Sequence, residues 1–279
     1  MKRGHAAEPS PSPRKSPAEE RLGALVHSQS ADVLLEVAGN PALTEDLALA
    51  LLARRDLPRG LVEALVKNAS VMKSRPVINA VARHPRTPRF IALPLLRHLY
   101  VFELMQIALV PGTPADLKMA AEENIVQRLE QVSSGERLAL ARRASSRVAA
   151  QLLLDPETRV IAAALDNPYL TEAWIVKTLM NEKAPQTFVE AVCKHSKWPV
   201  RREVQMALLR NDKTPLARVL YFAQMLPTHV LKDTLRYSRL SASVKMYLFR
   251  ELEQRAAKNA AKSEPPPPPA EPSGGEKPS

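Results

Sequence analysis

Residues that could carry out chemistry are few and scattered in this chain of 279 amino acids. Cys193 and His195 form the only close pair of good zinc ligands, and no second pair follows at metal-site spacing. The sequence contains no phosphate-binding loop, dinucleotide-binding turn or nucleophile elbow. Only four glycines fall between residues 31 and 255, so a cradle of main-chain N–H groups is hard to build. We therefore expect no catalytic residue, no metal and no cofactor.

The histidines and carboxylates in turns have a simpler explanation than catalysis. His84 and His195 occupy equivalent turn positions, and Asp155, Asp166 and Asp212 also lie in predicted turns. Side-chain acceptors at such positions close the main chain by accepting its N–H groups. We expect these five residues to stabilise turns.

Basic side chains are the more informative group, because 40 Lys and Arg oppose 29 Asp and Glu and give a formal charge of +11. They cluster in the second half of the chain, where a basic strip could attract nucleic-acid phosphates or an acidic protein surface. Trp198 follows Lys197 and is the one aromatic residue that we expect to stack on a ligand. The candidate partner-binding residues are Arg142, Arg143, Arg147, Lys194, Lys197, Trp198, Arg201, Arg202, Arg210, Lys213 and Arg218.

The elements that position these residues are predicted to be short helices. Apolar residues recur at spacings of three and four between proline breaks, and alternating strand patterns are absent. Thr87, Thr113 and Thr214 each precede a proline, which predicts a threonine N-cap followed by proline at the first helical position. The fold class is therefore all-α.

An internal duplication organises these helices. A shift of 127 residues aligns residues 31–123 with 158–250 without a gap, and 24 of the 93 aligned positions are identical. Chance matching would give about six identities at ordinary residue usage. Turns recur near residues 41, 69, 85 and 111, and again near 168, 196, 212 and 238. Short units that cannot bury an apolar stripe alone gain a continuous core by stacking, which predicts an α-solenoid.

The two copies differ in charge. The first has eleven basic and ten acidic side chains, and the second has fifteen and seven, a net charge of +8. Two interpretations stay open, because arginines shared with the neutral copy can pair with a neighbouring repeat or with helix C-termini. Lys197, Arg201 and Arg218 are special to the second copy and are the better binding candidates.

Residues 159–168 carry the pattern Arg-Val-x-x-Ala-x-x-x-Asn-Pro ahead of a helix expected to start at Thr171. This pattern resembles the leucine-rich repeat variant and HEAT-like repeats of bacterial proteins, over about 220 residues of the chain. The resemblance implies a right-handed α-solenoid of short helix pairs that binds macromolecules. Some HEAT-like proteins are DNA glycosylases with a catalytic aspartate, but no motif fixes such an aspartate here, so an enzyme is the least favoured alternative.

The expected organisation has five segments. A disordered N-terminal tail spans residues 1–24, the first solenoid copy 25–123, a helical insert 124–157, the second copy 158–256, and a disordered proline-rich tail 257–279. The five prolines of residues 265–269 are a possible ligand for a proline-binding domain.

The expected function is that of a non-enzymatic scaffold that binds a protein partner through the HEAT-like surface, with nucleic-acid binding by the basic second half as the alternative. No apolar run of the length that spans a membrane occurs, and the single cysteine agrees with a reducing compartment. We expect a cytoplasmic bacterial protein without a membrane partner.

Overall fold

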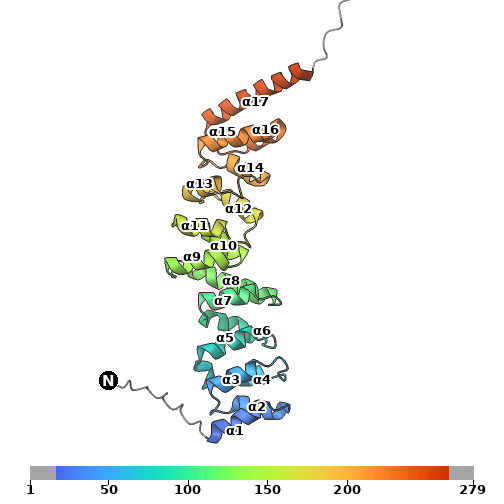
Figure 1. The fold of residues 1–279 in the computed structure, drawn as a ribbon, viewed down its shortest axis with the longest axis vertical. Coiled ribbons are helices and arrows are strands. Elements are labelled where there is room, and N and C mark those ends of the chain that lie inside the picture. Colours follow the sequence, from blue (N-terminus) through green and yellow to red (C-terminus); the bar gives the residue numbers. More distant parts are fainter. Residues whose placement is uncertain (1–16, 264–279) are drawn as a thin grey trace, which may run out of the picture. The chain divides into compact units, whose positions relative to one another are not determined.

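The computed structural model describes residues 17–263, which contain 17 α-helices, two short 3-10 helices and no strand (Figure 1). The all-α class predicted from helical periodicity is confirmed. The chain divides into two compact units, residues 1–149 and 150–279, and the boundary falls within helix α10 (Ser146–Leu152). None of the helices between residues 17 and 263 combines the length and apolar character needed to cross a membrane.

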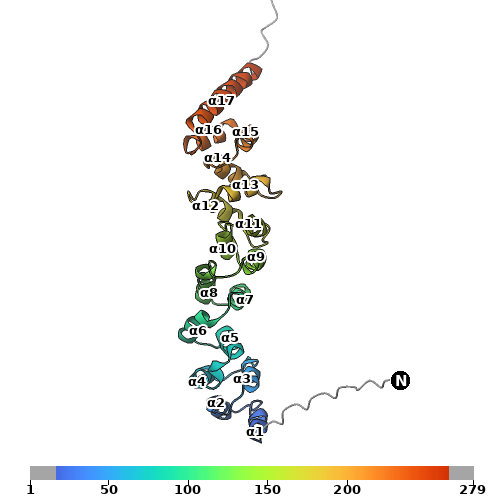
Figure 2. The ribbon, with the colours of Figure 1, turned by 90° about the vertical axis from the view of Figure 1, so that its left-hand side faces the viewer.

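The first unit packs each helix mainly against near neighbours in the chain. Helix α2 contacts α4, α3 contacts α5, and α7 packs closely on α8 (Figures 1 and 2). The α-helices are α1 (Pro17–Leu25), α2 (Ala31–Gly39), α3 (Glu45–Leu52), α4 (Leu61–Lys67), α5 (Arg75–Arg83), α6 (Arg89–Leu95), α7 (Val101–Leu109), α8 (Ala115–Arg128) and α9 (Ser134–Arg143). The 3-10 helices are η1 (Val71–Lys73) and η2 (Leu96–His98).

The second unit follows the same rule. Helix α11 contacts α13, α12 contacts α14, α14 contacts α16, and α16 packs on the last helix. Its helices are α11 (Thr158–Leu165), α12 (Glu172–Leu179), α13 (Gln186–Lys194), α14 (Arg202–Arg210), α15 (Leu216–Met225), α16 (Thr228–Arg236) and α17 (Ala242–Ser263).

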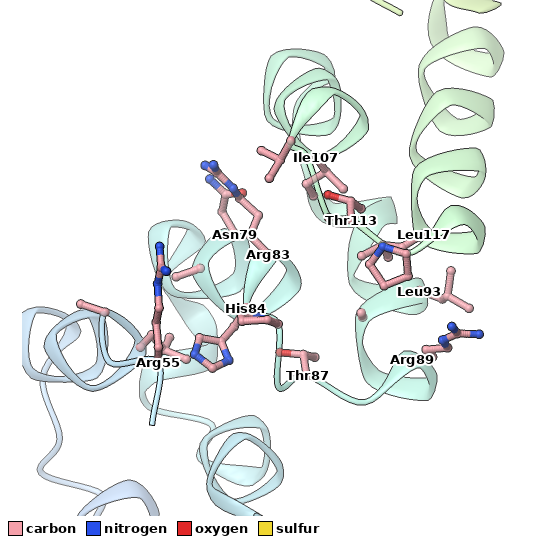
Figure 3. Close-up of a pocket in the computed structure, with 18 of the residues that line it drawn as sticks. Arg55, Asn79, Arg83, His84, Thr87, Arg89, Leu93, Ile107, Thr113 and Leu117 are labelled. Carbon is pink, nitrogen blue, oxygen red and sulfur yellow. The ribbon is translucent and has the colours of Figure 1, made fainter. Parts of the chain in front are cut away.

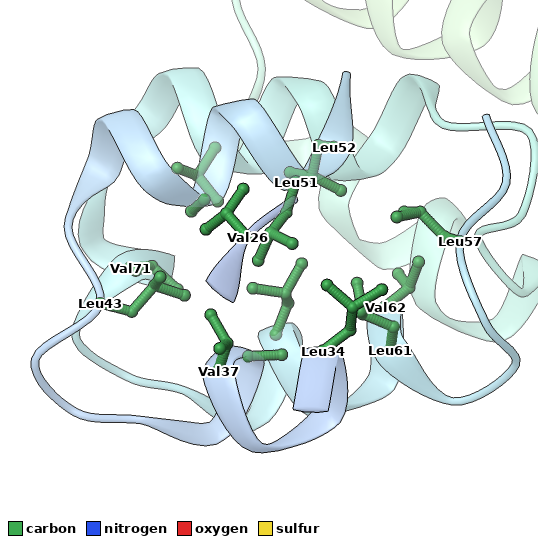
Figure 4. Close-up of a cluster of buried hydrophobic side chains, with 14 of the residues drawn as sticks. Val26, Leu34, Val37, Leu43, Leu51, Leu52, Leu57, Leu61, Val62 and Val71 are labelled. Atoms are coloured by element: carbon green, nitrogen blue, oxygen red, sulfur yellow. The ribbon is translucent and has the colours of Figure 1, made fainter. Parts of the chain in front are cut away.

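The core of each unit is built from the apolar stripes of these short helices. Leu34, Leu51 and Leu61 come from α2, α3 and α4, and their side chains meet in one buried cluster in the first unit (Figure 4). Val26, which follows α1, is fully buried in the same cluster. Helices of seven to nine residues are marginal alone, so this packing supplies most of their stability.

The threonine N-caps predicted at Thr87, Thr113 and Thr214 are wrong. The prolines that follow occupy the N-cap positions of α6, α8 and α15. The hydroxyls of Thr87 and Thr214 instead donate hydrogen bonds to main-chain oxygens of the preceding helix, Thr87 to Val81 and Thr214 to Leu208, both at 2.6 Å. Each of these carbonyls also accepts a main-chain N–H, from His84 and from Asn211, so the hydroxyl supplies a second hydrogen bond at the helix end.

The edges of the expected segments also need correction. Residues 17–24 were assigned to a tail, but they form most of α1, because Leu22 and Val26 bury apolar surface there. Residues 257–263 were likewise assigned to the C-terminal tail, but they continue α17. The boundary expected after residue 123 falls inside α8, which contains no proline or glycine to end it. The rest of both tails, including the five prolines, lies outside the described residues.

Candidate functional site

The predicted basic residues do not all belong to one unit. Arg142 and Arg143 are exposed in the last turn of α9, and Arg147 pairs with Glu123, so these three lie in the first unit. The remaining candidates lie in the second unit. The two groups are therefore described separately.

Turns in both units share a hydrogen-bond arrangement that we call the turn clasp. In a turn clasp, one side chain accepts the N–H of the residue two positions later and donates to a main-chain oxygen about 30 residues earlier. Asn68 accepts from Ser70 and donates to Ala38 O at 3.0 Å, and Asn211 donates to Leu179 O at 2.7 Å. Asn68, His84, Asn211 and Ser238 each form a turn clasp.

The histidines act in turns, as predicted. His84 accepts the N–H of Arg86 at Nδ1, and its Nε2 lies 2.9 Å from Arg54 O. His195 accepts the N–H of Lys197 at Nδ1, and its Nε2 lies 3.1 Å from the Asp166 carboxylate. Since Nδ1 accepts, the neutral ring carries its proton on Nε2 in both cases. All ring nitrogens are thus engaged in the fold.

The ligand-stacking role predicted for Trp198 is wrong. Its side chain is only 2% exposed, and its indole Nε1 donates to Leu165 O at 2.9 Å. The aligned residue Val71 is also 2% exposed, so this turn position belongs to the core in both units. The sequence signal for the burial of Trp198 is the apolar residue at the aligned position, Val71.

Two further candidates, Lys213 and Arg210, have polar atoms that are bonded or enclosed within the second unit. Lys213 donates through Nζ to the main-chain oxygens of Glu182 and Ala184. Arg210 is half-buried, and its Nε atom is enclosed without a hydrogen-bond partner. These contacts favour the structural interpretation for Lys213, because its ammonium group donates to main-chain oxygens in the connection between α12 and α13.

Five candidates of the second unit keep more accessible charge. Lys194, Lys197, Arg201 and Arg202 are exposed, and Arg218 is half-buried. Lys194 Nζ lies 3.8 Å from the Glu190 carboxylate, and its side chain remains 76% exposed. Such a pair contributes little to stability in water, so the lysine stays available to a partner.

A groove of about 490 Å³ connects two of these cations with exposed apolar side chains. Lys194 and Arg218 line it together with Val200, Tyr221 and Met225. Val200 is 71% exposed, Met225 58% and Tyr221 46%. Arg218, Tyr221 and Met225 follow the spacing of three and four that places residues on one face of α15. We call this cavity the α13–α15 groove.

The apolar part of the α13–α15 groove is missing from the sequence-predicted candidates, which are all basic apart from Trp198. The signal was present in α15, where Val219, Phe222, Ala223 and Leu226 are buried and occupy the opposite face. Because those residues form the buried stripe of α15, the side chains at positions 218, 221 and 225 face away from the core.

The one thiol that lines the α13–α15 groove is unreactive. Cys193 contributes to its lining but is buried, and desolvation raises the pKa of its thiol to about 11. The thiolate is the reactive form of cysteine, so this thiol is inert near neutral pH. Between residues 17 and 263, no three His, Cys, Asp or Glu side chains gather in a way that could hold a metal ion. The arrangement is suited to binding.

Comparison of the chain with protein-family models, with curated proteins and with solved structures found no match in any of the three.

Proposed function

We propose that this chain is a non-enzymatic, cytoplasmic bacterial scaffold that binds an acidic segment of a protein partner in the α13–α15 groove. The observation that carries the proposal is the junction of Lys194 and Arg218 with exposed Val200, Tyr221 and Met225. Basic groups favour a partner of opposite charge, and exposed tyrosine and methionine supply apolar contact area.

The proposal includes a fold of HEAT-like helix pairs that form an α-solenoid and arose by duplication. Contacts between helices two positions apart in the chain support such stacking in each unit. Aligned positions 127 residues apart also repeat contacts, since Asn40 accepts the N–H of Ala42 and Asn167 accepts the N–H of Tyr169. The paired bonds of Thr87 and Thr214 repeat at the same shift.

A photo-crosslinking experiment tests the proposal. The full chain would carry p-benzoylphenylalanine at Tyr221 and be irradiated in a bacterial lysate, with Tyr169 as the control position. Tyr169 is 53% exposed in the same unit but lies outside the groove. We expect a protein with an acidic segment to be crosslinked from position 221, and this product to disappear in the Lys194→Glu/Arg218→Glu variant.

Equal crosslinking from position 169 would contradict the assignment. Loss of the product on deletion of residues 264–279, with the groove intact, would instead assign binding to the proline-rich segment.

Nucleic-acid binding is the second candidate, favoured by Lys197, Arg201 and Arg202. These three cations lie at or just before the start of α14, and all are exposed. Labelled duplex and single-stranded DNA and RNA would be titrated at about 50 and 200 mM salt. Binding that weakens steeply with salt and disappears when the three charges are reversed would support this candidate. Binding that survives the reversals would exclude this surface.

A further inference from the structure

A second cavity, of about 740 Å³, lies wholly within the first unit (Figure 3). It is lined by α5, the starts of α6 and α8, the end of α7, and the turns near residues 54, 85 and 112. Its volume falls in the range of about 300–1,000 Å³ that is typical of ligand pockets. We call it the α5–α8 pocket. Nothing in the sequence analysis pointed to it, because its lining residues are spread over some 65 positions.

Several polar groups of the α5–α8 pocket are already occupied. The guanidinium group of Arg54 forms hydrogen bonds with Asp56 and with the main-chain oxygens of Val26 and Ser28. Arg89 lies 3.1 Å from the Asp116 carboxylate. As described above, His84 and Thr87 are engaged in their own turn. None of these groups is available to a ligand without breaking an internal contact.

Three other polar groups are left for a ligand. Arg55 is exposed and forms no hydrogen bond or ion pair within the described chain. Arg83 bonds only the Gln106 side chain, through Nη1 at 3.0 Å. The Oδ1 atom of Asn79 is enclosed and lacks a donor. Figure 3 shows these three side chains on one side of the pocket and Leu93 and Leu117 on the other.

The second unit treats the aligned positions differently. The residues 127 positions after Arg55 and Gly112 are Glu182 and Arg239, and their charged groups lie 3.7 Å apart. In the first unit no such pair can form, because Gly112 has no side chain and a basic residue replaces the acid. Gly112 has a φ of 86°, and the space beside its Cα is open. Arg55 is therefore left without the partner that its counterpart has.

We propose that the α5–α8 pocket binds an acidic peptide segment, with a carboxylate held by Arg55 and Arg83 and a peptide N–H donated to Asn79 Oδ1. Arginine guanidinium groups suit carboxylates in geometry and charge. Aliphatic walls that include Ile107 and Leu117 would take the apolar side chains beside the acid. The lining contains no Phe, Tyr or Trp on which a nucleobase could stack. This site is independent of the α13–α15 groove.

The test is a selection followed by titration. A phage-displayed library of random decapeptides is selected on the full chain, and the selected peptides are labelled and titrated by fluorescence anisotropy. We expect them to be enriched in Asp and Glu. Loss of one charge-assisted hydrogen bond makes binding about tenfold weaker or more, so Arg55→Gln and Arg83→Gln should each weaken it by that factor. Asn79→Leu should weaken it too.

The controls separate this site from other basic surfaces. Arg59→Gln removes an exposed charge nearby that does not line the pocket, and it should leave binding unchanged. Peptides held by the α5–α8 pocket should bind the Lys194→Glu/Arg218→Glu variant unchanged, because those two residues line the α13–α15 groove. A selected peptide that loses binding in that variant is bound by the groove instead. Thermal unfolding checks that each variant is folded.

Four outcomes would overturn the proposal. Three concern the peptides: a selection without acidic enrichment, equal weakening by Arg59→Gln, and a selection in which every peptide loses binding only in the Lys194→Glu/Arg218→Glu variant. Binding of ATP or inorganic phosphate that depends on Arg55, in place of acidic peptides, would also overturn it.

Discussion

The indole Nε1 of Trp198 donates a hydrogen bond to the main-chain oxygen of Leu165, 2.9 Å away. At the aligned position in the first unit, the oxygen of Ala38 accepts from the side-chain amide of Asn68 instead. Two different side chains therefore satisfy the same carbonyl at the end of a helix. A buried helix-end carbonyl without a hydrogen-bond donor lowers the free energy of unfolding. Trp198 therefore stabilises the fold through this hydrogen bond.

Replacement of Trp198 by Phe should destabilise the second unit. The ring is kept, but the oxygen of Leu165 loses its indole donor, which costs about 1–3 kcal/mol for a buried group. Urea unfolding followed by far-UV circular dichroism would measure the change. The control is Trp174→Phe, because Trp174 is half-buried and its ring contacts Lys177. Equal effects of the two substitutions would contradict the role of the indole N–H.

Replacement of Asn211 by Ala should remove a whole turn clasp. Asn211 is 1% exposed, donates to Leu179 O at 2.7 Å and accepts the N–H of Lys213 at 2.9 Å. Losing both bonds leaves two main-chain groups unpaired, and we expect a cost of about 2–4 kcal/mol. Contrary to the turn role expected from the sequence, Asp212 is exposed and its side chain forms no hydrogen bond within the described residues. It provides the matched control, and Asp212→Ala should stay within about 0.5 kcal/mol. A similar midpoint of urea unfolding for both variants would count against the turn clasp.

The thiol of Cys193 should be protected in the folded chain. Its pKa is raised to about 11, first by burial, so about one thiol in a thousand is ionised at pH 8. We expect Ellman's reagent to react at once in about 6 M guanidinium chloride but very slowly in native buffer. The native rate should rise about tenfold per pH unit, since the reactive thiolate gains in proportion. Immediate reaction of the native chain at pH 8 would show that the site is open.

Acid should weaken the turn between α3 and α4. A hydrogen bond from Arg54 lowers the pKa of Asp56 below its usual value, so folding favours the carboxylate. This contribution is present above the unfolded pKa of about 3.9 and is lost as the pH falls through the folded value. Asp56→Asn should therefore be less stable than the natural chain at pH 7, and the difference should shrink towards pH 2.5. A difference that is the same at both pH values would refute the pairing.

The helices followed from the sequence, because proline breaks and apolar spacing act locally. The turn roles of His84 and His195 were predictable for the same reason. The threonine N-caps were not, because the prolines take the N-cap positions. The burial of Trp198 was not predicted, because an aromatic residue beside a lysine suggested a ligand-stacking role. The apolar residue at the aligned position, Val71, indicates a core position instead. Lys213 shows a different limit, since its partners are main-chain oxygens some 30 residues away and any residue supplies such an oxygen.

The two cavities show why surfaces were harder to predict than elements. The α13–α15 groove joins residues of α13, α14 and α15 with the turn between α13 and α14. The outward face of α15 could be predicted once its buried face was identified. The α5–α8 pocket depends on what is missing as much as on what is present. Gly112 leaves space, and Arg55 stands where the aligned position of the second unit has an acid, Glu182. Arg55 and Gly112, which are far apart in the sequence, line the same pocket only in the folded chain, so the sequence alone does not reveal the pocket.

The turn clasps carry a consequence for how this chain can change over time. Each acceptor is a main-chain oxygen, which survives any substitution, so only the donor must be chosen. Asn, His and Ser already serve as donors in different turns. Residues at these turns are therefore interchangeable as long as they can donate a hydrogen bond. The sequence at these turns can change considerably while the same hydrogen bonds between turns and helices are kept.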